Sequence, residues 1–182
     1  QIAPCMRDED LRADRQPEFY QIDIEMSFGT PKDLFPCIES MMARIFKKCL
    51  DTKIPESFQQ ITHKECIDKY GTDKPDLRFG MPLVDIGDLA KESSFSIFLE
   101  VLSQEGLIKG LCVKKGSDIS RRQIDEYTKF VGQFGIKGLA WMKLNDGTLS
   151  SSIVKFFSPE LQEKLIERFE AEDGDLLFFI AD

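Results

Sequence analysis

The feature that most constrains the fold is an alternation of residue types near the start of the chain. Apolar side chains take every second position from Tyr20 to Phe28, and the positions between them are mostly polar. Successive side chains of a β-strand point to opposite faces of the sheet. The pattern therefore predicts a strand with one face on a hydrophobic core, paired across a charged loop with an earlier strand. The apolar set is Tyr20, Ile22, Ile24, Met26 and Phe28, and the opposite set is Phe19, Gln21, Asp23, Glu25 and Ser27.

Two helices are predicted to follow this hairpin. The first begins at about residue 31, where Thr30 can cap it, Pro31 suits the first turn and Asp33 can close a capping box. A second, shorter helix begins at the T-x-x-E capping box from Thr62 to Glu65, with His63 exposed in its first turn and Gly71 at its end. The buried stripe of the first helix is expected at Leu34, Ile38, Met41, Ile45 and Cys49.

The rest of the chain carries its own complete pattern. Gly71, Pro75, Gly80 and Pro82 interrupt any regular spacing, so we place a boundary near residue 80 and expect domains 1–80 and 81–182. Helices are predicted from Ser120 to Gly135 and from Ser158 onwards, and strands at 95–99, 107–113, 139–144, 153–157 and 176–180. The fold class is therefore α+β, and the order ββαββαβ resembles a ferredoxin-like split sheet with helices on one face.

Composition excludes several classes of protein. The five cysteines include no C-x-x-C pair, which favours reduced thiols in a cytoplasmic protein. A single histidine leaves little material for histidine catalysis or for a histidine metal site. No apolar run approaches the roughly 18 residues that span a bilayer, so we expect no membrane partner. The net charge of −8 disfavours a protein that coats nucleic acid, and no DNA partner is expected.

The polar face of the predicted hairpin carries chemically useful groups. Arg7 and Glu9 are two positions apart and so project from one face of the first strand, and Phe19, Gln21 and Asp23 share a face of the second. A guanidinium, two carboxylates, an amide and an aromatic ring suit a ligand with a phosphate, a flat base and an ammonium group. An exposed hairpin whose charges are simply solvated explains the same residues, and this reasoning alone leaves both readings open.

The stretch from Arg7 to Phe19 resembles motif 2 of the class II aminoacyl-tRNA synthetases, which reads R-x-E, a loop, then R/H-x-x-x-F. Arg7-Asp8-Glu9 and Arg15-Gln16-Pro17-Glu18-Phe19 occupy these positions, with Met6 where phenylalanine is usual. The longer string through Asp23, and that from Tyr70 to Arg78, are similar to the aspartyl enzymes specifically. The tail, including Arg121 to Tyr127 and Asp173-Gly174-Asp175, resembles the insertion domain that bacterial aspartyl enzymes share with the B subunit of the tRNA-dependent amidotransferase.

The resemblance implies a role for each motif residue. Arg7 would be the catalytic group, contacting the α-phosphate of ATP and the aspartate carboxylate while charge builds there. Asp8, Glu9 and Gln16 would belong to the ATP site, Glu9 at the adenine amino group or the ATP tail. Phe19 would stack on adenine, and Asp23 would receive the substrate ammonium in a buried charge pair. The loop residues that would meet the tRNA acceptor end are Asp10, Arg12, Asp14 and Arg15.

The resemblance also implies partners that the chain alone does not reveal. ATP and L-aspartate would be substrates, Mg²⁺ would assist the full enzyme, and tRNA(Asp) would be the acceptor, with tRNA(Asn) left open. The full-length enzyme would be a homodimer, and no metal ligand is assigned in this segment. Motif 1, motif 3 and an anticodon-binding barrel are not found, so we expect an inactive fragment of a longer protein.

Two other hypotheses stay open beside the synthetase fragment. The second half could be a tRNA-binding or interaction module without catalysis, since a ferredoxin-like sheet can present itself to RNA. Its basic residues are scattered and are expected to form a solvated rim; they are Lys109, Lys114, Lys115, Arg121 and Arg122. Alternatively the chain is a structural adapter with a decayed motif, against which the intact motif residues argue.

Overall fold

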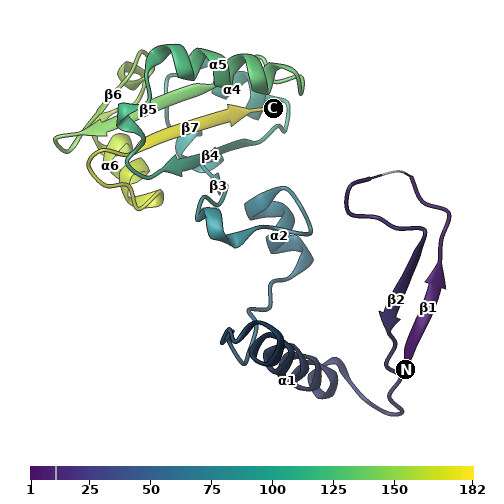
Figure 1. Ribbon diagram of the computed structural model, residues 1–182. Helices are drawn as coiled ribbons and strands as arrows, with labels where there is room; N and C mark the ends of the chain where they lie inside the picture. Colours follow the sequence, from purple (N-terminus) through teal and green to yellow (C-terminus); the bar gives the residue numbers. More distant parts are fainter. Residues whose placement is uncertain (11) are drawn as a thin grey trace. The chain divides into compact units, whose positions relative to one another are not determined.

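The computed structural model describes residues 1–10 and 12–182, and these form two compact units, Gln1–Gln60 and Ile61–Asp182 (Figure 1). The first unit contains an antiparallel hairpin of β1 (Ile2–Met6) and β2 (Glu18–Ile22), then the long helix α1 (Pro31–Leu50). Thr30 caps α1 in a full capping box with Asp33, as predicted.

The predicted extension of the second strand to Phe28 is wrong, because β2 ends at Ile22. The ladder closes where the Asp23 amide donates to the Gln1 carbonyl, and β1 offers no partner for the residues that follow. Phe28 has a positive φ of 57°, which breaks an extended conformation.

The predicted core contacts of the first unit are absent from its described residues. None of them is buried, and the apolar face of the hairpin is exposed, at 71% for Tyr20 and 56% for Ile22. The α1 stripe, predicted as buried, is only partly covered. Its residues Leu34, Ile38 and Met41 are half-buried, whereas Ile45 is 40% exposed and Cys49 is exposed. One hairpin and one helix supply too little apolar surface to cover both faces.

The second unit holds the whole hydrophobic core around a five-stranded antiparallel sheet of order β3-β4-β7-β5-β6. It opens with α2 (His63–Tyr70), which Thr62 caps and Gly71 ends as predicted, and with an exposed His63. The strands are β3 (Val84–Asp85), β4 (Ile108–Val113), β5 (Ala140–Asn145), β6 (Thr148–Ser150) and β7 (Leu176–Ala181). The other helices are η1 (Leu77–Phe79), α3 (Gly87–Lys91), α4 (Ser96–Ser103), η2 (Gly116–Asp118), α5 (Arg121–Gly132), η3 (Val154–Phe156) and α6 (Pro159–Arg168).

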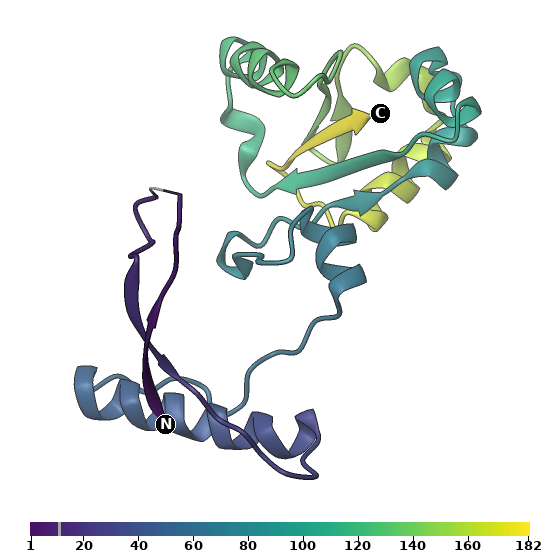
Figure 2. The same cartoon turned by 90° about the vertical axis from the view of Figure 1, so that its right-hand side faces the viewer.

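Helices cover both faces of this sheet, so the prediction of helices on one face is wrong (Figure 2). The continuous apolar run of β7 explains why both faces are covered, because its alternate residues pack into two different hydrophobic clusters. Leu177 and Phe179 pack with α3, α4 and α6, whereas Leu176 and Phe178 pack against Ile124 of α5. The α+β class with antiparallel strands is confirmed, and the ferredoxin-like resemblance extends only to the order β-α-β-β-α-β from β4 to β7.

Two predicted strands are helical. Residues 95–99 lie at the start of α4, where Phe95, Phe98 and Leu102 follow helical spacing and bury one side of the helix. A short apolar run cannot be assigned to strand or helix by period alone. Residues 153–157 contain the 3₁₀ turn η3, and the edge strand is β6 instead. Its turn is Asp146-Gly147, both with positive φ, as two-residue hairpins favour.

The sequence-based division into domains 1–80 and 81–182 stays a prediction. α2 lies in the second compact unit, where the Leu83 amide donates to the Lys69 carbonyl at 2.6 Å and Lys109 Nζ donates to the Asp68 carbonyl at 2.7 Å. No helix among the described residues is both long and apolar enough to cross a membrane.

Candidate functional site

The register of the hairpin places the candidate residues on one face. Cys5 lies opposite Phe19 and Ala3 opposite Gln21, and residues directly opposite in a ladder share a face. The Arg7 amide donates to the Pro17 carbonyl at 2.8 Å, so the ladder continues one residue beyond β1. Alternation along each strand then puts Arg7 and Asp23 on the same face as Phe19.

Arg7 and Phe19 are brought into direct contact. The guanidinium carbon of Arg7 lies 5.3 Å from the centre of the Phe19 ring, within the range of a cation–π interaction. Phe19 is half-buried, whereas Tyr20 on the opposite face is 71% exposed. The polar face of the hairpin is thus the less exposed of the two at this point, and it presents an aromatic ring beside the positive charge of Arg7.

Glu9 and Arg15 meet across the loop. Arg15 donates to Glu9 Oε2 at 2.6 Å, and the Arg15 amide closes a turn on the carbonyl of Arg12 at 3.2 Å. The Glu9 side chain is 21% exposed and that of Arg15 is 42% exposed. This pair holds the Glu9 carboxylate near the end of the ladder.

The far end of the face carries Gln21 and Asp23. The Cys5 thiol donates to Gln21 Oε1 at 3.1 Å, and Gln1 Nε2 donates to Asp23 Oδ2 at 3.2 Å. Asp23 is exposed, so the buried environment expected for its carboxylate is not present in this segment. Gln21 was recognisable in the sequence by its period-two position, although its thiol partner depends on the register.

The remaining site residues are exposed. Within residues 1–10 and 12–182, no side-chain contact brings them together. They are Asp8, Asp10, Arg12, Asp14 and Gln16. In the described part of the chain, no three histidine, cysteine, aspartate or glutamate side chains lie together as a metal ion would need.

Three of the five basic residues predicted to form a solvated rim, Lys109, Lys114 and Arg122, have partners within the second unit. Lys114 donates to buried Asp175 at 3.0 Å and to the Glu170 carbonyl at 2.6 Å, and Arg122 pairs with Glu126 at 3.2 Å. Lys109 reaches the Asp68 carbonyl, as described above. These partners reduce the positive charge that the second unit offers to a nucleic acid backbone.

Comparison with known proteins adds the decisive observation. Residues 98–182 match the GAD domain, and three relatives, each named aspartate–tRNA(Asp/Asn) ligase, align over all of this chain. Identity is 54% to the protein of Protochlamydia amoebophila, 55% to that of Chlamydia muridarum and 50% to that of Natranaerobius thermophilus. The chain is a fragment of an aspartyl-tRNA synthetase. It spans 30% of the length of the first relative and 31% of the other two.

The hairpin that carries the motif 2 resemblance lies in the first unit, and the GAD domain occupies most of the second. The roles of the individual site residues stay predictions.

Proposed function

We propose that the protein containing this fragment activates L-aspartate with ATP and transfers the aspartyl group to tRNA(Asp) and tRNA(Asn). The single observation that carries the proposal is the shared face of Arg7, Phe19 and Asp23, with the Arg7 guanidinium over the Phe19 ring. The names of the relatives, which specify both tRNAs, support the two acceptors.

The proposed chemistry needs position and charge and no nucleophilic side chain. A carboxylate oxygen of aspartate attacks the α-phosphorus of ATP, and pyrophosphate leaves with the electron pair of the broken P–O bond. A ribose hydroxyl at the 3′ end of the tRNA then attacks the carbonyl carbon, and AMP leaves. Arg7 stabilises the negative charge that builds in the first step, and its contact with Phe19 fixes the guanidinium beforehand.

The proposed adenine site lies at the loop end of the face. Phe19 offers a ring for stacking, and Asp8 and Gln16 flank the nucleotide in this proposal. Glu9 already has Oε2 on Arg15, so a ligand amino group would take Oε1 and leave the ion pair in place. Asp10, Arg12, Asp14 and Arg15 form the loop that we assign to the tRNA acceptor end.

The proposed aspartate site extends along the hairpin. Arg7 pairs with Pro17 near one end and Asp23 pairs with Gln1 at the other, about 20 Å apart at roughly 3.3 Å per residue. A free amino acid is shorter than this separation. For one aspartate to contact both residues, the long Arg7 side chain must lean along the face toward Asp23, and its contact with the Phe19 ring, which lies between them, points it that way.

The residues present do not by themselves make a magnesium site, since the acidic side chains of the described loop do not cluster and Glu9 is paired with Arg15. We assign Mg²⁺ only to the full-length enzyme. In the same proposal the hairpin belongs to a class II antiparallel catalytic domain within residues 1–80, and residues 81–182 form the insertion domain. The full-length enzyme is proposed to be cytoplasmic and a homodimer.

The test is aspartate-dependent exchange of pyrophosphate into ATP by the full-length enzyme. Arg7→Ala is expected to reduce exchange on the order of 10²- to 10³-fold, as loss of one group that stabilises transition-state charge does. Arg12→Ala, which removes an exposed arginine of the same loop, is the matched control and should leave exchange nearly unchanged. Equal exchange by the Arg7 variant and the wild type would show that the site is misassigned. Charging assays on both purified tRNAs then test the acceptors.

A further inference from the structure

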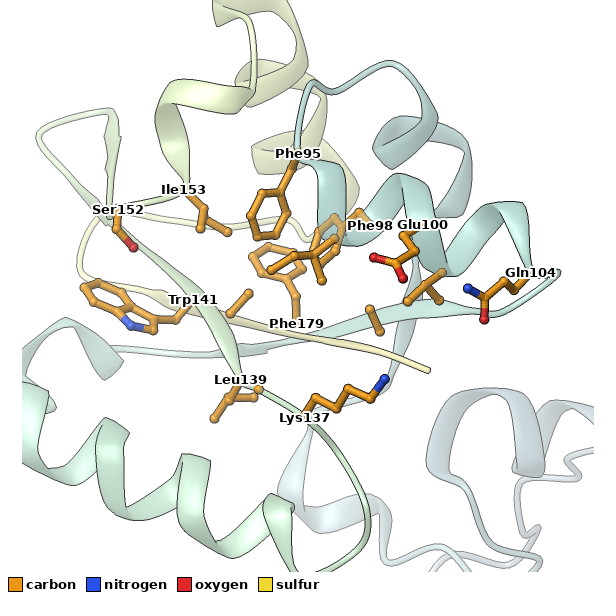
Figure 3. Close-up of a pocket in the computed structure, with 15 residues that line it drawn as sticks. Phe95, Phe98, Glu100, Gln104, Lys137, Leu139, Trp141, Ser152, Ile153 and Phe179 are labelled. Atoms are coloured by element: carbon orange, nitrogen blue, oxygen red, sulfur yellow. The ribbon is translucent and has the colours of Figure 1, made fainter.

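A cavity of about 340 Å³ lies between α4 and the start of β5, in the second unit and apart from the hairpin (Figure 3). The rings of Phe95, Phe98 and Phe179 gather on one side of it, and Leu139 and Trp141 line the other. Its volume falls in the range of pockets that hold ligand groups. An apolar group of substantial size therefore fits between the helix and the strand.

The strand beside this cavity has a free edge. β6 pairs with β5 only from Lys143 to Asn145; the chain then leaves the ladder, and Ser152 and Ile153, which precede and enter the turn to η3, line the cavity without pairing with β5 (Figure 3). The Leu144 amide and carbonyl both bond the β7 side, at Asp175 and Gly174. Because peptide groups alternate in direction along a strand, those of Trp141 point to the side that β6 leaves open. Among the described residues no strand pairs with β5 at that point.

Charges of opposite sign stand on the two walls at the mouth of the cavity. Glu100 projects from α4 and Lys137 from the segment before β5, and Figure 3 shows both beside the opening. Both residues are exposed, and neither forms an ion pair within the described part of the chain. The mouth thus offers one site for a basic group and one for an acidic group.

We propose that this groove binds an extended segment of a partner protein, which adds as a strand to the free edge of β5. The partner backbone bonds the N–H and C=O of Trp141, a bulky apolar side chain enters the cavity, and a basic and an acidic side chain meet Glu100 and Lys137. The complement of an open strand edge is another strand, whereas a small apolar molecule would leave these peptide groups unpaired.

The assay uses the intrinsic fluorescence of Trp141, which is the only tryptophan of the chain and lines the groove. The probe is a capped peptide of alternating threonine and valine with one central phenylalanine, one lysine and one aspartate, titrated into the 182-residue chain. A saturable change in fluorescence is expected. N-methylation of alternate peptide amides should weaken binding at least about tenfold in one register and little in the other, because only one set of amides faces β5.

Charge exchange tests the orientation. Glu100→Lys is expected to weaken binding about fivefold, and a peptide with glutamate in place of its lysine should recover it. Glu163→Lys, an exposed change on α6 away from the groove, is the matched control and should have no effect. The proposal is overturned if no saturable change occurs, or if both N-methylated registers weaken binding equally. It is also overturned if the fluorescence depends on protein concentration without peptide, since a second copy would then occupy the edge.

Discussion

Asp175 is the charged side chain on which the second unit most depends, and its removal should be costly. It is 1% exposed and lies at the start of β7, between the two cores of the sheet. Its carboxylate accepts from the amides of Lys115 at 2.9 Å and Glu172 at 2.8 Å, from Lys114 Nζ at 3.0 Å and from the Cys112 thiol at 3.4 Å. Each of these donors would lose this acceptor in Asp175→Ala, although Lys114 would keep its bond to the Glu170 carbonyl.

The magnitude follows from these bonds. Two partly buried amides left without a charged acceptor cost about 1.5 kcal/mol each, and the half-exposed Lys114 adds less because water replaces its partner. We expect Asp175→Ala to lower the free energy of unfolding by about 3–4 kcal/mol. Asp173→Ala is the matched control in the same loop: Asp173 is exposed and accepts one bond, from the Gly147 amide at 2.8 Å, so its loss should cost under about 1 kcal/mol.

Urea unfolding followed by Trp141 fluorescence measures the free energy of unfolding of both variants. Trp141 reports on this region because it packs against the cluster that contains Leu176 and Phe178, beside Asp175. The pH dependence provides a second measurement. Burial alone would raise the pKa of Asp175, but the two amides, Lys114 and the Cys112 thiol outweigh it and lower the pKa below the usual 3.8. This stabilisation is therefore present above about pH 4 and is lost as the pH falls through the folded-state pKa. If Asp175→Ala costs no more than Asp173→Ala, the reasoning is refuted.

Three further outcomes are expected. Burial, and then the neighbouring Asp175 carboxylate, raise the pKa of the Cys112 thiol to about 12. Iodoacetamide at pH 8 should therefore label the exposed Cys37 and leave Cys112 unlabelled until the chain is unfolded. Labelling of both cysteines in the folded chain would contradict this. Gly110→Ala should destabilise by about 1–3 kcal/mol, since its Cβ would meet the Phe178 carbonyl at 2.7 Å, whereas Gly138→Ala, with nothing within 4 Å, should be tolerated in the same unfolding assay. The 182-residue chain mixed with ATP, aspartate and tRNA should give no charged tRNA in a filter assay, and robust charging would disprove its dependence on the rest of the enzyme.

Local signals in the sequence predicted local structure well. The capping box at Thr30 forms as expected, Thr62 caps α2, and the helix predicted from Ser120 begins there, because a cap involves only residues a few positions apart. The buried strand at 176–180 was also recognisable from its uninterrupted apolar run. The sequence did not predict that both faces of this strand are buried, with Leu177 in one hydrophobic cluster and Leu176 in the other. This arrangement depends on where distant helices pack.

The candidate site shows the same division. Alternation was enough to place Phe19 and Asp23 on one face, since strand geometry alone decides it. The contact of Arg7 with Phe19 and the pairing of Glu9 with Arg15 depend on the register of the hairpin and the path of its loop. Neither contact can be predicted from the spacing of the residues in the sequence. The strand predicted at 95–99 failed for a related reason, because burial of Phe98 against Phe179 selects the helix.

The absence of buried residues in the described part of Gln1–Gln60 has a consequence for the stability of that unit. A hairpin and a helix that bury nothing have no stability of their own and wait for chain that will pack on them. The segment with the motif 2 resemblance thus depends on contacts outside residues 1–60 for its stability, whereas the unit that follows it, Ile61–Asp182, carries its own core.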